Sequence, residues 1–132
     1  MLKRLLATSL ALVATVALAS GAADIDYSDF DDDLMRNMDD AIKDLDSNVG
    51  GQDAEASLAN VNALREGLAV AEKYFAAKPE TPRGAGLARE GQEHLALVAQ
   101  ALAAKDFDTA STNVRGVVRT CKACHEAYKP PE

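Results

Sequence analysis

Four segments of this chain repeat apolar residues at intervals of three and four positions, which places those residues on one face of a helix. The first begins after a predicted N-cap at Ser28 and ends at Gly50-Gly51, and the others cover about 53–77, 87–104 and 107–128. Aromatic residues make up only 5% of the chain, which disfavours a β-sandwich or barrel. Helices of similar length joined by short turns predict an all-α fold, an antiparallel up-down-up-down four-helix bundle.

The residues expected to face the core form thin stripes that are rich in alanine. They are Met35, Met38, Ile42, Leu45 and Val49 in the first segment; Leu58, Val61, Leu64, Leu68, Ala71 and Phe75 in the second; Leu87, Gly91, Leu95, Val98 and Leu102 in the third; and Ala110, Val114, Val117, Cys121 and Cys124 in the fourth. A domain this small buries little surface, so the pattern suggests that a bulky apolar group completes the core.

Residues 1–23 have the pattern of a secretory signal peptide. Lys3 and Arg4 precede an uncharged, mostly apolar run over 5–18, and small residues offer cleavage after Ala19 or Ala23. The alternative is a membrane anchor, but the apolar run is shorter than the ~20 residues that span a bilayer. The sequence therefore predicts an exported protein, with the periplasm as the simplest destination, a mature domain over 24–132 and no membrane span after cleavage.

The chain is acidic, with a net charge of −7, and the acidic excess is concentrated near the start of the mature domain. Residues 24–53 hold 11 acidic residues and two basic ones, Arg36 and Lys43. This balance argues against nucleic-acid binding, because phosphate contacts need Lys and Arg. The acidic surface is either a solvated face that keeps the protein soluble or a docking surface for a basic partner.

The chemistry is concentrated in the motif Cys121-x-x-Cys124-His125, which is the attachment signal for c-type haem. On a helix these three positions share a face, so the two thiols can form thioethers to one porphyrin edge while the imidazole faces the iron. A disulfide or thioredoxin-like redox pair is one alternative, but that pair belongs at a helix start beside a sheet. A zinc site is another, and His94 is the only further histidine for it.

With this motif near its C-terminus, the chain resembles the class II c-type cytochromes, the cytochrome c-prime family. The resemblance rests on the segment 120–129, TCKACHEAYK, and on the expected four-helix architecture. Residues 33–73 also resemble the related soluble b-type four-helix cytochrome. The resemblance implies one covalently attached haem c, with Cys121 and Cys124 as thioether residues and His125 as the proximal iron ligand.

The sixth iron ligand decides the function that the resemblance implies. In the family, the residue that faces this position comes from the start of the first helix. In this chain that region contains Met38, the predicted ligand, and Met35, the alternative. With a methionine ligand, the protein is expected to be a low-spin one-electron carrier and not an enzyme. The alternative is a high-spin, five-coordinate cytochrome that binds nitric oxide or carbon monoxide. The expected partners are redox proteins with a basic docking patch, and the chain is expected to be a monomer or a homodimer.

Overall fold

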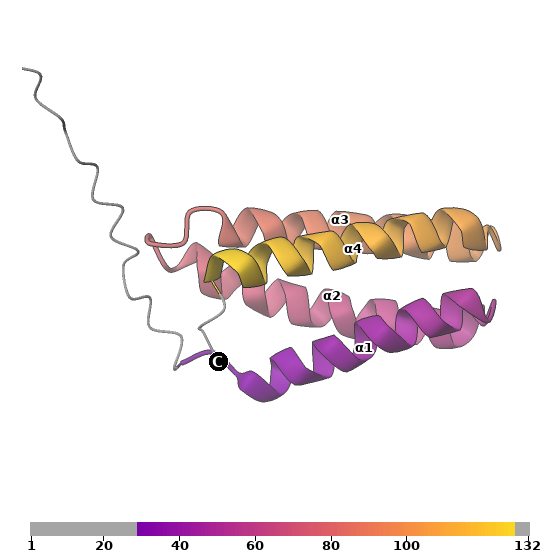
Figure 1. Ribbon diagram of the computed structural model, residues 1–132, viewed down its shortest axis with the longest axis horizontal. Helices are drawn as coiled ribbons and strands as arrows, with labels where there is room; N and C mark the ends of the chain where they lie inside the picture. Colours follow the sequence, from indigo (N-terminus) through magenta and orange to yellow (C-terminus); the bar gives the residue numbers. More distant parts are fainter. Residues whose placement is uncertain (1–28, 129–132) are drawn as a thin grey trace, which may run out of the picture.

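The computed structural model describes residues 29–128, which form four α-helices. The helices are α1 (Asp32–Gly50), α2 (Ala54–Ala76), α3 (Gly84–Ala103) and α4 (Phe107–Tyr128). Consecutive helices run antiparallel and pack side by side, and α1 also contacts α4 (Figure 1). The predicted all-α four-helix bundle is confirmed. The predicted signal peptide at 1–23 lies outside the described residues.

Three of the helices begin at an aspartate whose carboxylate caps the first turn. Asp31 caps α1, accepting hydrogen bonds from the backbone N–H groups of Asp33 at 2.9 Å and Leu34 at 3.1 Å. The cap of α1 is therefore Asp31 and not the predicted Ser28, which lies outside the described residues. Asp53 and Asp106 accept equivalent bonds, each 3.0 Å long, at the starts of α2 and α4. A cap of this kind stabilises a helix by about 1 kcal/mol.

Two details of the predicted helices are wrong. The third helix begins at Gly84, three residues before the predicted Leu87, directly after the proline-containing loop. In α2 the buried position near the start is Ser57, whereas Leu58 is 44% exposed. Ser57 precedes Val61 by four residues and continues the inner stripe, and its hydroxyl donates a hydrogen bond of 2.6 Å to the carbonyl oxygen of Asp53. That bond offsets the cost of burying a polar group.

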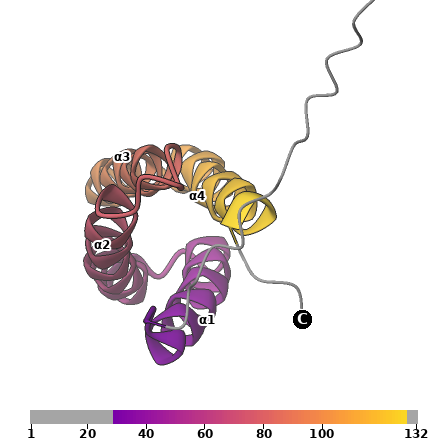
Figure 2. The same cartoon turned by 90° about the vertical axis from the view of Figure 1, so that its left-hand side faces the viewer.

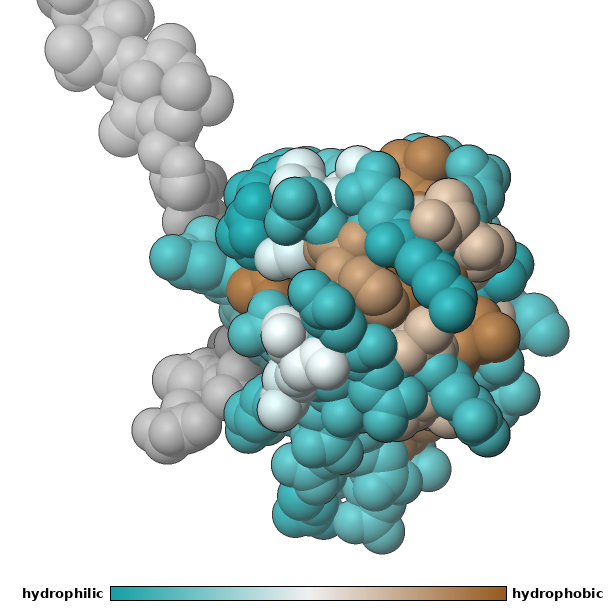
Figure 3. Space-filling model, turned by 90° about the vertical axis from the view of Figure 1, so that its right-hand side faces the viewer, coloured by the Kyte–Doolittle hydropathy of each residue, from teal (hydrophilic) through white to brown (hydrophobic). Residues whose placement is uncertain are grey.

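The core is a single cluster of apolar side chains contributed by all four helices. Its largest fully buried members include Leu45, Leu64, Leu95, Val114 and Val117. Seen from the end that carries the α1–α2 and α3–α4 turns, the surface is mostly hydrophilic, with hydrophobic residues showing between the polar ones (Figure 3). Most of the predicted inner residues are buried, but Met35 and Ile42 of α1 and both cysteines of α4 are only half-buried.

Three of the four helix pairs are held close by a large side chain packed on a glycine. The pairs are Met38 on Gly67 between α1 and α2, Phe75 on Gly84 and Leu68 on Gly91 between α2 and α3, and His94 on Gly116 between α3 and α4. A Cβ atom at Gly67, Gly84 or Gly116 would lie 2.5 Å from the packed side chain, so these approaches need glycine. Among the described residues no glycine serves the α1–α4 pair, which has the sparsest contact, and the ring of helices is open there (Figure 2).

An aromatic cluster joins the helices at the end where α1 begins and α4 ends. Phe75 lies between Phe30, at a centroid distance of 6.3 Å, and Tyr128, at 5.5 Å. Tyr74 meets Phe30 edge-on at 4.7 Å and donates a hydrogen bond of 2.7 Å to Asp29. The cluster therefore connects the approach to α1 and the last turn of α4 through residues of α2.

Replacement of Gly67 by alanine is expected to destabilise the bundle. The added methyl group would meet the Met38 Sδ and Cγ atoms at 2.5 and 2.6 Å, so the Met38 side chain must shift. Overpacking costs about 1–3 kcal/mol, which is reduced by the gain of up to about 1 kcal/mol for alanine over glycine in a helix. Gly86→Ala is the matched control, because nothing lies within 4 Å of a Cβ atom there and a Gly→Ala change in a helix is stabilising by up to about 1 kcal/mol. Urea unfolding followed by circular dichroism measures both. Equal stability of the two variants would show that the Met38–Gly67 approach is not tight.

Candidate functional site at the α1–α4 interface

A cavity of about 440 Å³ that is widely open to solvent lies between α1 and α4. Its size is within the range of small-molecule and cofactor pockets, about 300–1,000 Å³. We call this space the α1–α4 cavity. Seven residues from the two helices line it: Asp39, Ile42, Val118, Cys121, Lys122, His125 and Glu126.

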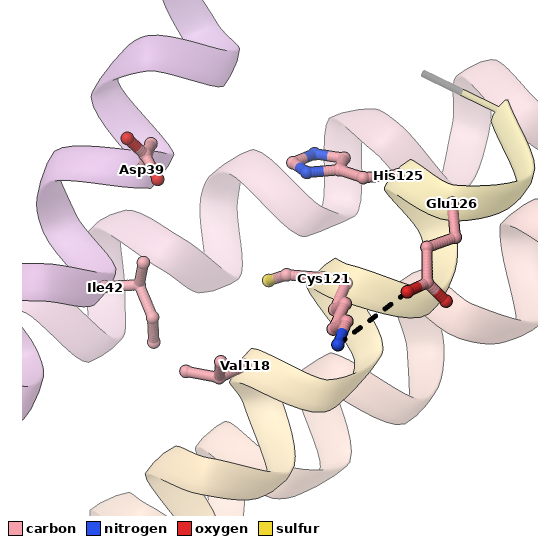
Figure 4. A pocket seen from close by; sticks show the side chains of 7 residues that line it. Asp39, Ile42, Val118, Cys121, His125 and Glu126 are labelled. Carbon is pink, nitrogen blue, oxygen red and sulfur yellow. Dashed lines mark ion pairs between the residues drawn. The ribbon is translucent and has the colours of Figure 1, made fainter.

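The α4 wall of this cavity carries two of the predicted site residues. Cys121 and His125 are four residues apart and therefore lie on one face of the helix. The Cys121 sulfur and the His125 ring both extend from α4 toward α1, with Val118 one turn below (Figure 4). Cys124 does not line the cavity; it is half-buried and packs against the core. Both cysteines are free thiols.

The α1 wall carries Asp39 and Ile42, and neither predicted methionine lines the cavity. Met38 is buried, with 7% of its surface exposed, and its thioether packs on Gly67 of α2. Met35 is half-buried. Because α-helical positions seven apart differ by only about 20° around the axis, Met35 is on the same edge of α1 as Ile42. Met38 is displaced from that edge toward α2.

Sequence reasoning missed Asp39 and Val118 as lining residues. Asp39 follows Met35 by four positions and precedes Ile42 by three, so helical spacing places it on the same side of α1 as both. This spacing did not single out Asp39 from the sequence, because acidic residues are so frequent along this helix. Val118 was not assigned because it follows the buried Val117, which continues the inner stripe of α4.

Two exposed ion pairs stand at the rim of the cavity. Asp39 accepts a bond of 2.6 Å from Lys43, one turn further along α1, and Lys122 lies 3.8 Å from Glu126 on α4. All four side chains are at least 60% exposed, and such pairs contribute at most about 1 kcal/mol each to stability. The charges are therefore more relevant to the electrostatic potential in the cavity than to the fold.

Partial burial raises the pKa of both thiols above their ordinary value. Burial raises the pKa of Cys124 to about 11, with a smaller contribution from Cys121. The pKa of Cys121 is also raised, mainly by burial and in lesser part by the negative charge of Asp39, against the lowering effect of a backbone hydrogen bond. A thiol that exchanges disulfides needs a lowered pKa, so these shifts argue against the thioredoxin-like alternative.

His94 belongs to the α3–α4 interface. Its ring packs on Gly116, and its Nδ1 atom is 3.2 Å from Oδ1 of Asn113. It is not among the residues that line the α1–α4 cavity. Within residues 29–128, no three His, Cys, Asp or Glu side chains are grouped so that they could hold a metal ion.

None of the helices in the described range 29–128 is both long enough and apolar enough to cross a membrane. Comparisons of the chain with protein-family models, with curated proteins and with solved structures found no match. The fold and the cavity together define an all-α four-helix protein with a cysteine and a histidine facing a space between its first and last helices.

The haem-free chain is expected to lose stability at alkaline pH. The pKa of Cys124 in the folded chain, about 11, is above its ordinary value of 9.0. The folded state therefore holds this proton more tightly, a stabilisation that is complete below pH 9.0 and is lost as the pH rises to about 11. In a Cys121→Ser variant, the rate at which iodoacetamide alkylates Cys124 should increase with pH only well above pH 9.0, the ordinary pKa of the thiol. In urea the same thiol should titrate near its ordinary pKa, and a folded midpoint at or below that value would contradict the burial argument.

Proposed function

We propose that this protein is a periplasmic mono-haem c-type cytochrome that carries single electrons. The observation that supports the proposal most strongly is that Cys121 and His125, two members of the haem-attachment motif, face the α1–α4 cavity from one helix. The exported location is supported by the sequence of residues 1–23, which lie outside the described range.

The residues of the cavity fit a covalently held haem. Both thiols are free, as thioether formation requires, and they lie three residues apart on one helix. Ile42 and Val118 provide an apolar lining, while the charged residues stay at the rim. In this proposal Cys121 and Cys124 hold the porphyrin, and His125 is the proximal iron ligand.

When bound, the haem supplies a one-electron iron couple whose potential depends on its axial ligands, nearby hydrogen bonds and burial. The residues of this chain would hold and orient the group at a space that stays open to solvent. The apolar lining from α1 and α4 disfavours the additional positive charge of ferric iron. Close packing around the other three helix pairs limits movement of the cavity walls, which suits a carrier that must change shape little between oxidation states.

A methionine of α1 is the proposed sixth ligand, and the two candidates are supported by different observations. The resemblance to the b-type cytochrome favours Met38. The contacts of α1 favour Met35, because Met38 is packed on Gly67 of α2, whereas Met35 lies on the edge of α1 that borders the cavity. We give Met35 the greater weight, because ligation by Met38 would require its side chain to leave a tight contact in the core.

The second candidate function is a five-coordinate cytochrome that binds nitric oxide or carbon monoxide. The observation that favours it is that neither methionine lines the cavity, so the apolar Ile42 is the side chain that α1 places there beside Asp39. An apolar distal side without a strong ligand leaves an open position for a small gas.

Haem attachment is expected to be visible in the mass and colour of the full-length chain produced in a host that matures c-type cytochromes. The purified protein should be red, and its mass should exceed that of the peptide beginning after Ala19 or Ala23 by one haem. A Cys121→Ala, Cys124→Ala double variant is the control and should lack covalent haem, because no thioether can form. A colourless wild-type protein with an unmodified mass and two free thiols would contradict the proposal.

Paired methionine variants are expected to identify the sixth ligand. Met35→Leu should turn a low-spin visible spectrum into a high-spin one that responds to carbon monoxide, since leucine keeps the volume but has no sulfur. Met38→Leu should keep the low-spin spectrum and change stability by less than about 1.5 kcal/mol, because it replaces a core side chain by one of similar size. The reverse result would assign Met38. A wild-type protein that is already high-spin and binds carbon monoxide would support the gas-binding function.

A further inference from the structure

We infer that Asp39 lowers the reduction potential of the haem, an inference that depends on the proposed function. Asp39 is the charged side chain that α1 contributes to the cavity lining, and it faces Cys121 and His125 across the space between the helices (Figure 4). The sequence pattern alone did not distinguish this residue from its acidic neighbours.

The position of Asp39 separates it from the other acidic residues of α1. The neighbouring Asp40 is also exposed but does not line the cavity, because one residue along a helix rotates the side chain by about 100°. The negative charge of Asp39 reaches the α4 wall, where it contributes to the raised pKa of the Cys121 thiol. A charge that acts on Cys121 also acts on a group attached to Cys121.

The sign of the effect follows from elementary electrostatics. Ferric haem carries one more positive charge than ferrous haem, so a carboxylate at the cavity stabilises the ferric form and lowers the potential. Asp39 lies on the cavity side of α1 beside the half-buried Ile42, so part of its interaction with the cavity passes through protein, where charges interact more strongly than through water. Acidic residues on the outer face of α1 act through solvent and are screened by salt.

The positive charges of two lysines at the cavity partly offset the negative charge of Asp39. Lys43 donates to Asp39 over 2.6 Å, and Lys122, 3.8 Å from Glu126, lines the α4 side. The Lys43–Asp39 pair is exposed, with side-chain exposures of 66% and 60%, so water reduces the mutual neutralisation of the two charges. Removal of Lys43 should therefore leave Asp39 more effective and move the potential in the opposite direction from removal of Asp39.

The test is a spectroelectrochemical redox titration of the holoprotein at low ionic strength. Asp39→Asn should raise the midpoint potential, Lys43→Gln should lower it, and Asp40→Asn should shift it clearly less than Asp39→Asn does. Asp40→Asn is the matched control because it removes the same charge from the adjacent position on the same helix. The visible spectrum of each variant checks that the axial ligands are unchanged.

A shift for Asp39→Asn that is absent, downward or no larger than that for Asp40→Asn would overturn the inference. A change of spin state in Asp39→Asn would overturn it as well, because the carboxylate would then act by holding the ligands in place and not by its charge. Failure of the proposed function gives a different result: the wild-type protein would carry no covalent haem, and both the function and this inference would be rejected before any titration.

Discussion

The arrangement of the bundle depends on close packing of large side chains on glycines at three of its four helix interfaces. Met38 on Gly67, Phe75 on Gly84 and His94 on Gly116 bring successive helices together in the order of the chain. The first and last helices have no such contact within the described part of the chain, and they are held in the ring mainly by their other neighbours. The cavity lies at this fourth interface because the packing that closes the other three is missing there.

The chemistry of the cavity depends on which residues remain at that loosely packed interface. On α4 the inner stripe continues into two half-buried thiols, and this burial raises the pKa of both. His125 follows one turn after Cys121 on the same wall. Three charged residues, Asp39, Lys122 and Glu126, also line the space, and their ion pairs run along their own helices. The result is a solvent-open space with a histidine and a cysteine on one side, a carboxylate on the other, and Ile42 and Val118 as its apolar part.

The helices and the attachment motif could be predicted because both depend on short-range spacing. Intervals of three and four residues identified the four helices, and the attachment motif identified two residues of the α4 wall, Cys121 and His125, whereas its third residue, Cys124, does not line the cavity. Spacing alone could not decide between Ser57 and Leu58, since either precedes Val61 by a helical interval. It also could not reveal that Gly67 receives Met38, because that contact depends on how far α1 is rotated about its axis against α2. The spacing did place Asp39 beside Met35 and Ile42, but the many acidic residues of α1 concealed this signal. The identity of the bound group and of the sixth ligand stays a prediction.

The aromatic cluster at the end of the bundle has a consequence for the spacing of the two cavity walls. Phe75 of α2 contacts both Phe30, which leads into α1, and Tyr128, which ends α4. The separation of the two cavity walls at this end is therefore set by a residue that touches neither wall's lining. This spacing of α1 and α4 therefore does not depend on the size of the lining side chains Ile42 and Val118.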